Sequence, residues 1–164
     1  MSTLVATKGL AIAASLFTGG LIESVSLFSV PALLVAPHNI AAKQFKLIYG
    51  IGISTQAPSS VVAAILHAFI AYRFHQAGSG TWSRWATSAA LMGCIVPFTI
   101  AMMEPVNRQL LAIAGTGDAK EGGTEVSAKT EGLLRRWNVL NAVRGSLAVA
   151  AGAIGLWTVL ENGI

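Results

Sequence analysis

Charged residues are scarce in this sequence, and cysteine occurs only once. Asp, Glu, Lys and Arg make up 11% of the 164 residues, whereas a soluble domain usually carries about 25%. The lone Cys94 excludes an intrachain disulfide, a CxxC redox pair and a thiolate metal site. Apolar residues are abundant instead, at 54% of the chain with a mean hydropathy of +0.65. This composition indicates an integral membrane protein.

The excess of positive charge is small and dispersed. Eleven Lys and Arg residues against seven Asp and Glu residues give a net charge of +4. No basic run is interleaved with aromatic residues, so the sequence does not indicate a nucleic-acid partner. We interpret the basic residues as loop and interfacial anchors, and their distribution favours cytosolic first and third loops.

Four apolar runs separated by polar stretches predict an all-α fold. We expect an integral membrane four-helix bundle in which residues 1–164 form a single domain, with spans at about 10–35, 59–74, 85–103 and 140–160. Residues 36–58 are expected to form a polar and aromatic loop, and residues 115–131 a hydrophilic loop outside the membrane. Pro97, inside the third span, should kink its helix. The chain is therefore expected to be a multi-pass membrane protein, in an endomembrane such as the ER if its source is eukaryotic.

The fourth apolar run begins with three residues that share one helix face. Trp137, Asn141 and Arg144 are spaced i, i+4 and i+7. A charge at the centre of a membrane helix costs roughly 2.5–3.5 kcal/mol on insertion scales, and less near the edge. Either Arg144 snorkels to the interface and pairs structurally, with Trp137 as a belt residue, or this polar end lines a ligand cavity.

Polar residues also interrupt the other spans. Glu23 is either a structural partner of Arg144 or a catalytic carboxylate, and His67 is either a satisfied core residue or a general base. Glu104, Asn107 and Arg108 either cap the third span or form the rim of the same cavity. Because polar groups that face lipid are costly, we predict that five of these side chains converge on one interior cavity, namely Glu23, His67, Asn107, Asn141 and Arg144.

The sequence does not indicate a metal site or a resident cofactor. It contains no Glu-x-x-His pair of the kind that holds di-iron centres. His67 and His75 are eight residues apart and do not form an i, i+4 metal pair. No glycine-rich phosphate loop precedes a helix.

Several segments together resemble one family. The third span contains Pro97-Phe-Thr and then Met103-Glu-Pro-Val-Asn-Arg-Gln-Leu, and the fourth begins with Arg136-Trp-Asn-Val-Leu-Asn-Ala-Val-Arg-Gly. With the first-span segments Gly19-Gly20, Ser24-Val-Ser and Val30-Pro-Ala-Leu, this pattern resembles the anthrone oxygenase family of small integral membrane proteins. The resemblance implies oxidation of a polyketide anthrone to an anthraquinone, a step of secondary metabolism, with molecular oxygen as co-substrate and no cofactor.

The resemblance also suggests roles for individual residues. The first-loop stretch Tyr49-Gly-Ile-Gly-Ile-Ser-Thr lacks the histidine that many fungal members carry there, so that histidine's role is either vacant here or passes to His67. His67 would then be the base, with Glu23 as the alternative. Arg144 and Asn141 would hold the developing oxyanion. Trp137 and Phe98 would stack on a planar substrate, and Asn107 and Thr99 would complete its binding site.

The implied partners are a lipophilic aromatic small molecule and membrane lipid, and a homo-oligomer is compatible with them. The alternative is a non-enzymatic membrane protein that binds or carries a lipophilic molecule, or that supports a partner protein. An enzyme needs a closed pocket with a base near a donor. A carrier needs a path to both faces or to the lipid, and a scaffold needs no cavity.

Overall fold

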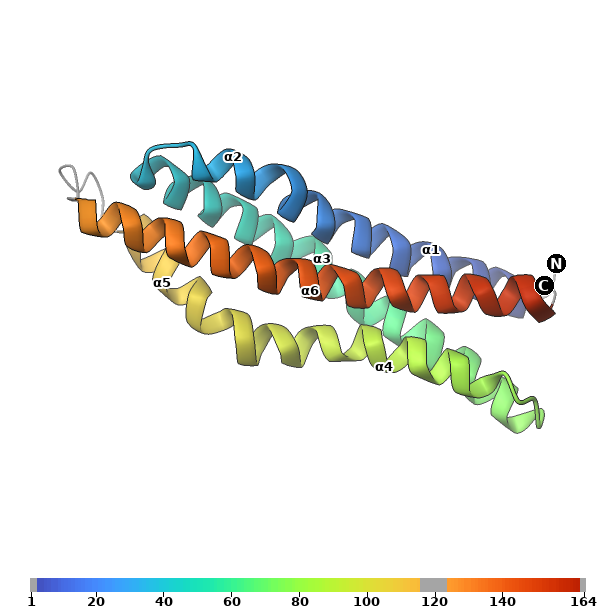
Figure 1. Ribbon diagram of the computed structural model, residues 1–164. Helices are drawn as coiled ribbons and strands as arrows, with labels where there is room; N and C mark the ends of the chain where they lie inside the picture. The colour runs from blue at the N-terminus through green and yellow to red at the C-terminus, as the bar shows by residue number, and fades with distance from the viewer. Residues whose placement is uncertain (1–2, 116–123, 163–164) are drawn as a thin grey trace.

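The computed structural model describes residues 3–115 and 124–162, and all regular elements within these ranges are helices (Figure 1). In chain order the elements are α1 (Thr3–Ser24), the π-helix η1 (Val25–Ser29), α2 (Val30–Leu34), α3 (His38–Gln76), α4 (Trp82–Phe98), the π-helix η2 (Thr99–Met103), α5 (Glu104–Gly115) and α6 (Thr124–Asn162).

These elements make four rods that alternate in direction, which confirms the predicted all-α four-helix bundle. α1, η1 and α2 form the first rod, α3 the second, α4, η2 and α5 the third, and α6 the fourth. α1 packs against α6 and α3, and α4 packs against α3 and α6. The start of α1 and the end of α6 lie at the same end of the bundle (Figure 1). The four stretches long and apolar enough to cross a membrane are Thr3–Leu34, His38–Gln76, Trp82–Gly115 and Glu125–Asn162.

The helices extend further than the sequence predicted. Residues 38–58, expected as a loop, form the first half of α3, with Pro58 inside the helix. The polar and apolar sides of this half are arranged for a membrane: Gln56 is buried, whereas Leu47 and Ile51 are exposed where lipid would lie. Residues 124–131, expected in the third loop, form the start of α6. The rest of that loop, residues 116–123, lies outside the described residues.

Proline and a π-helix interrupt the third rod where a kink was predicted. Pro97 lies near the end of α4, η2 follows directly, and the rod bends between α4 and α5 (Figure 1). Proline removes a backbone N–H and clashes with the preceding turn, so the α-helical pattern cannot pass through it unchanged. The first rod has a related interruption, since η1 is followed by Pro31 at the start of α2.

Glycines let α1 and α6 approach each other closely. A Cβ atom on Gly19 would lie 3.0 Å from the backbone nitrogen of Val149, and one on Gly152 would lie 3.2 Å from that of Leu16. Neither backbone nitrogen can move without shifting its helix. This contact follows the general pattern of membrane helices, in which small residues permit tight packing.

Candidate functional site

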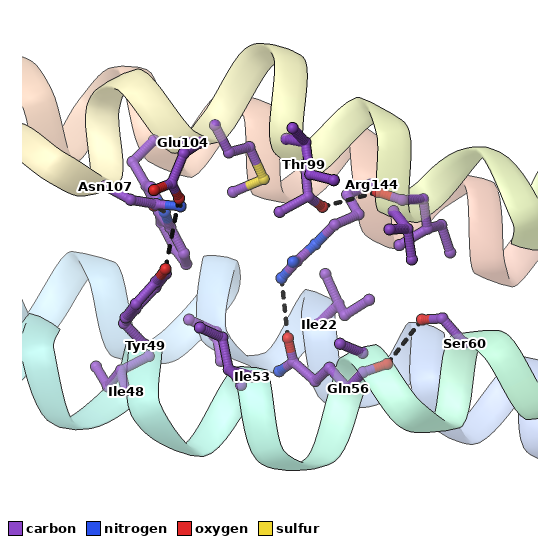
Figure 2. Close-up of a pocket in the computed structure, with 18 residues that line it drawn as sticks. Ile22, Ile48, Tyr49, Ile53, Gln56, Ser60, Thr99, Glu104, Asn107 and Arg144 are labelled. Atoms are coloured by element: carbon purple, nitrogen blue, oxygen red, sulfur yellow. Dashed lines mark hydrogen bonds between the residues drawn. The ribbon is translucent and has the colours of Figure 1, made fainter.

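A cavity of about 240 Å³ lies between α3 and the α4–η2–α5 rod, beside the two π-helices (Figure 2). This volume is comparable with the smaller small-molecule pockets, which begin at about 300 Å³. Of the eighteen lining residues only Arg144 and Glu104 carry a charge, and most of the rest are apolar. The lining residues with polar side-chain atoms are Tyr49, Gln56, Ser60, Thr99, Glu104, Asn107, Trp137 and Arg144.

Arg144 extends from α6 into this cavity and contacts neutral amide groups. Its Nη2 atom donates to Oε1 of Gln56 at 2.9 Å and to Oδ1 of Asn141 at 2.7 Å. Its buried Nε atom has no hydrogen-bond partner. Among the described residues the ion pairs are Arg84–Glu161, Arg108–Glu104 and Arg135–Glu131, so none of them neutralises Arg144.

Asn141 links the guanidinium of Arg144 to the first rod and so fixes its position. Its Nδ2 atom donates to the backbone carbonyl of Ile22 at 2.9 Å and to Oγ of Ser26 at 2.8 Å. Both partners belong to the first rod, and Asn141 is fully buried. The amide is therefore held with its oxygen toward Arg144, which orients the cation into the cavity.

The other polar end of the cavity is built around the carboxylate of Glu104. Oε1 of Glu104 accepts from Nε of Arg108 at 3.0 Å. Oε2 is 3.4 Å from both the Tyr49 hydroxyl and Nδ2 of Asn107, and each of these groups donates to it. Asn107 in turn accepts at Oδ1 from the indole Nε1 of Trp137 at 2.8 Å. This chain of contacts joins α3, α5 and α6 at one wall of the cavity.

Several residues predicted to form the site do line this cavity. Arg144, Asn107, Trp137 and Thr99 are part of its wall, and Asn141 contacts Arg144 directly. The hydroxyl of Thr99 donates to the backbone carbonyl of Ile95, within its own rod. Phe98 is not among the lining residues and packs instead against the core cluster that contains Trp137.

The predicted convergence of five side chains is wrong: Asn107 and Arg144 line the cavity, Asn141 contacts Arg144 without lining it, and His67 and Glu23 lie outside it. His67 is fully buried, its Nε2 is 2.8 Å from the Ser15 hydroxyl, and its ring lies 5.6 Å from that of Trp85. The carboxylate of Glu23 accepts from the Ser146 hydroxyl at 3.4 Å. His67 lies where α3 meets α1 and α4, and Glu23 lies where α1 meets α6, so each group has its partner within a contact between helices. The catalytic roles suggested for His67 and Glu23 remain predictions.

Sequence reasoning missed Tyr49 and Gln56 as site residues. Both lie in the stretch expected to be a loop, where no helix face could be assigned to them. Read as a helix, Tyr49, Gln56 and Ser60 are spaced i, i+7 and i+11 and therefore share one face. That spacing was the available signal, and a shorter expected helix concealed it.

The donor atoms of the cavity suit an organic ligand. Its wall offers one carboxylate and no histidine or cysteine side chain. Within residues 3–115 and 124–162, no group of three or more His, Cys, Asp or Glu side chains is placed to hold a metal ion. The apolar wall, with a cation at one end and a carboxylate at the other, matches the usual makeup of a small-molecule site.

Comparison with known proteins places the chain among relatives with similar sequences. Residues 45–154 match the family described as "Anthrone oxygenase". "Monooxygenase hypC" of Dothistroma septosporum is 30% identical over 145 residues, which cover 85% of this chain and 75% of that protein. An "Anthrone oxygenase" of Claviceps purpurea is 30% identical over 93% of this chain and 87% of its own length. "Anthrone oxygenase encC" of Aspergillus fumigatus is 31% identical, with 94% and 93% covered.

No solved structure matches the chain at a significant level. The family match covers well over half of the sequence and includes the residues of α3, α5 and α6 that form the cavity wall. The chain belongs to the anthrone oxygenase family.

Proposed function

We propose that this membrane protein is an oxygenase that oxidises a polyketide anthrone to an anthraquinone, with molecular oxygen as co-substrate and no resident cofactor. Its family and the names of its relatives support the oxygenase class. Four helices long and apolar enough to cross a membrane support a membrane location, and we extend this to a multi-pass protein of an endomembrane such as the ER, if the source is eukaryotic.

The observation that carries the proposal is the unneutralised Arg144 in an apolar cavity. A buried cation is costly unless an anion or strong acceptors compensate it. Arg144 has two neutral acceptors and a buried Nε atom without a partner. A ligand that becomes anionic during the reaction would supply the missing charge, and the enolate of an anthrone is such a ligand.

The chemistry requires a stabilised enolate. The methylene of an anthrone lies between two aromatic rings and opposite a carbonyl, so loss of a proton places negative charge on the carbonyl oxygen. The electron-rich enolate transfers one electron to oxygen, and recombination forms a C–O bond and a peroxide at the former methylene carbon. Loss of water then gives the quinone. Arg144 would hold the enolate oxygen through its guanidinium N–H groups, in a site that largely excludes water.

The route to the cavity fits a lipophilic aromatic substrate. Ile53 on α3 and Ile100 on η2 both line the cavity, yet they are 53% and 65% exposed. They lie within stretches long and apolar enough to cross a membrane, and we infer that their exposed sides face the lipid. A flat apolar substrate dissolved in the bilayer could pass between α3 and η2 without crossing the aqueous phase.

Purified protein in lipid nanodiscs tests the function. Oxygen consumption and anthraquinone formation are measured with and without protein, after treatment with a metal chelator and without added flavin or nicotinamide. Activity above spontaneous air oxidation that survives the chelator is the expected result. Saturable anthrone binding without turnover would instead support the alternative, a carrier or binding protein that uses the same lipid-facing cavity.

A further inference from the structure

We propose that Glu104 is the proton acceptor of the reaction, and this inference rests on the proposed function. Glu104 is the one carboxylate that lines the cavity, and Arg144 is the one cation that does so. The carboxylate of Glu104 lies beside Tyr49, and the guanidinium of Arg144 lies further along α3, beside Gln56 (Figure 2). The protein therefore holds a base and an oxyanion partner around a single apolar space.

The separation of the two ends fits an anthrone. On α3, Tyr49 contacts Glu104 and Gln56 contacts Arg144. On α6, Trp137 contacts Asn107 beside Glu104, and Arg144 lies seven residues further along. In both pairs the residues are seven apart, which is two helical turns and about 10 Å at 1.5 Å per residue. In an anthrone the carbonyl oxygen and the methylene carbon lie on opposite sides of the central ring, about 4 Å apart by ordinary bond lengths. An anthrone with a contact of about 3 Å to each group therefore fits within the spacing of these residues along the helices.

The contacts of Glu104 leave one of its oxygens able to accept a proton. Oε1 is engaged by Arg108 at 3.0 Å. Oε2 is 3.4 Å from both of its donors, Tyr49 and Asn107, and this distance exceeds the usual range of about 2.7–3.2 Å. Oε2 is therefore oriented by two groups on the cavity wall but only weakly bonded to them. Oε1 is engaged by the exposed side chain of Arg108. The C–H group of a substrate in the cavity would therefore meet Oε2 first.

The proposed sequence balances in atoms and electrons. Glu104 takes one methylene proton, and the C–H electron pair moves into the enolate held by Arg144. Oxygen adds at the same carbon, and the protonated Glu104 returns its proton to the resulting peroxide anion. Glu104 then removes the second proton from that carbon, the C=O bond forms as the O–O bond breaks, and the departing hydroxide takes the proton to become water. One anthrone and one oxygen molecule give one anthraquinone and one water.

Deuterium exchange without oxygen isolates the first of these steps. Anthrone is incubated anaerobically in deuterated buffer with the protein in nanodiscs, and deuterium entering the methylene is measured by mass spectrometry. The variants are Glu104→Gln, Glu104→Asp and His67→Phe. Glu131→Gln is the matched control, because Glu131 also forms an i, i+4 ion pair with an arginine but is exposed and does not line the cavity. Tryptophan fluorescence measures anthraquinone binding by each variant as a check on folding.

We expect the wild type and Glu131→Gln to accelerate exchange equally, and Glu104→Gln to lose about 10²–10⁴-fold while still binding anthraquinone, the usual contribution of a general base. If Glu104→Gln does not bind, Glu104→Asp decides: in a variant that binds, exchange slower than wild type supports the assignment, and exchange at the wild-type rate overturns it. Unchanged exchange in Glu104→Gln overturns the assignment, and loss confined to His67→Phe moves the role to His67. Wild-type protein that neither exchanges nor oxidises anthrone refutes the proposed function itself.

Discussion

Replacing Arg144 by leucine tests the central electrostatic argument. The guanidinium is the only positive charge on the cavity wall, so the variant removes the group proposed to hold the enolate oxygen. Loss of one preorganised donor to a developing oxyanion typically costs about 10²–10³ in kcat, or roughly 2.7–4 kcal/mol. We expect kcat/KM for anthrone oxidation to fall by at least that factor.

Stability should change much less than activity, for reasons visible in the contacts. The substitution leaves Oε1 of Gln56 and Oδ1 of Asn141 without the Nη2 donor, at about 1–3 kcal/mol for each unsatisfied group. It also removes a partly buried cation without an ionic partner, and the penalty for burying a charge is itself several kcal/mol. The two effects oppose each other, so thermal unfolding should occur near the wild-type temperature.

The assay is anthraquinone formation in nanodiscs, corrected for spontaneous oxidation, beside a thermal unfolding measurement. Arg144→Lys serves as the comparison because it keeps the charge but loses the planar donor group, and its activity should fall between wild type and Arg144→Leu. A folded Arg144→Leu protein with full activity would refute the proposed role of the guanidinium. Equal activities of the Lys and Leu variants, both well below wild type, would show that geometry matters and charge does not.

Three further substitutions test other parts of the structure. Gly19→Ala should lower the stability of the α1–α6 contact by about 1–3 kcal/mol, because the added methyl group overpacks against Val149. Gly20→Ala should not, because nothing lies within 4 Å of its added Cβ atom. Unfolding in detergent compares the two variants. Ile100→Trp should slow oxidation of membrane-dissolved anthrone without lowering stability. Val139→Trp should leave the oxidation rate unchanged, because Val139 is 64% exposed but does not line the cavity. Equal rates in the two variants would argue against entry beside Ile100. Trp137→Phe leaves Oδ1 of Asn107 without its donor and should cost about 1–3 kcal/mol, whereas the exposed Trp157→Phe should be nearly neutral in the same unfolding assay.

The fold could be predicted from the sequence because the hydropathy and length of each apolar run are local properties. Four apolar runs are enough to predict four helices in a membrane, and Pro97 is enough to predict the bend. Helix ends are harder to predict, because polar residues such as Gln56 lower the local hydropathy even when they face the interior of a bundle. That effect placed residues 38–58 in a loop and concealed the α3 wall of the cavity.

The site was only partly predictable because the depth at which each side chain lies along the bundle depends on packing between helices. Trp137, Asn141 and Arg144 share a helix face at any depth, so their grouping follows from spacing alone. Whether His67 reaches the same cavity depends on how far along the bundle it lies. His67 is eleven residues, or three turns, beyond Gln56 on α3, which is about 16 Å at 1.5 Å per residue. Its partners there are Ser15 and Trp85, residues that no local pattern connects with it.

The π-helix η2 explains why Glu104 and Arg144 can face one space. A π-helical turn accommodates one residue more than an α-helical turn, so the residues that follow are rotated by about 100° relative to an uninterrupted α-helix. Thr99, Ile100 and Met103 within η2, and Glu104 directly after it, all line the cavity. The interruption caused by Pro97 therefore has two consequences that depend on each other: it separates the third rod from α3 where the cavity forms, and it turns the carboxylate into the space that the cation enters from α6.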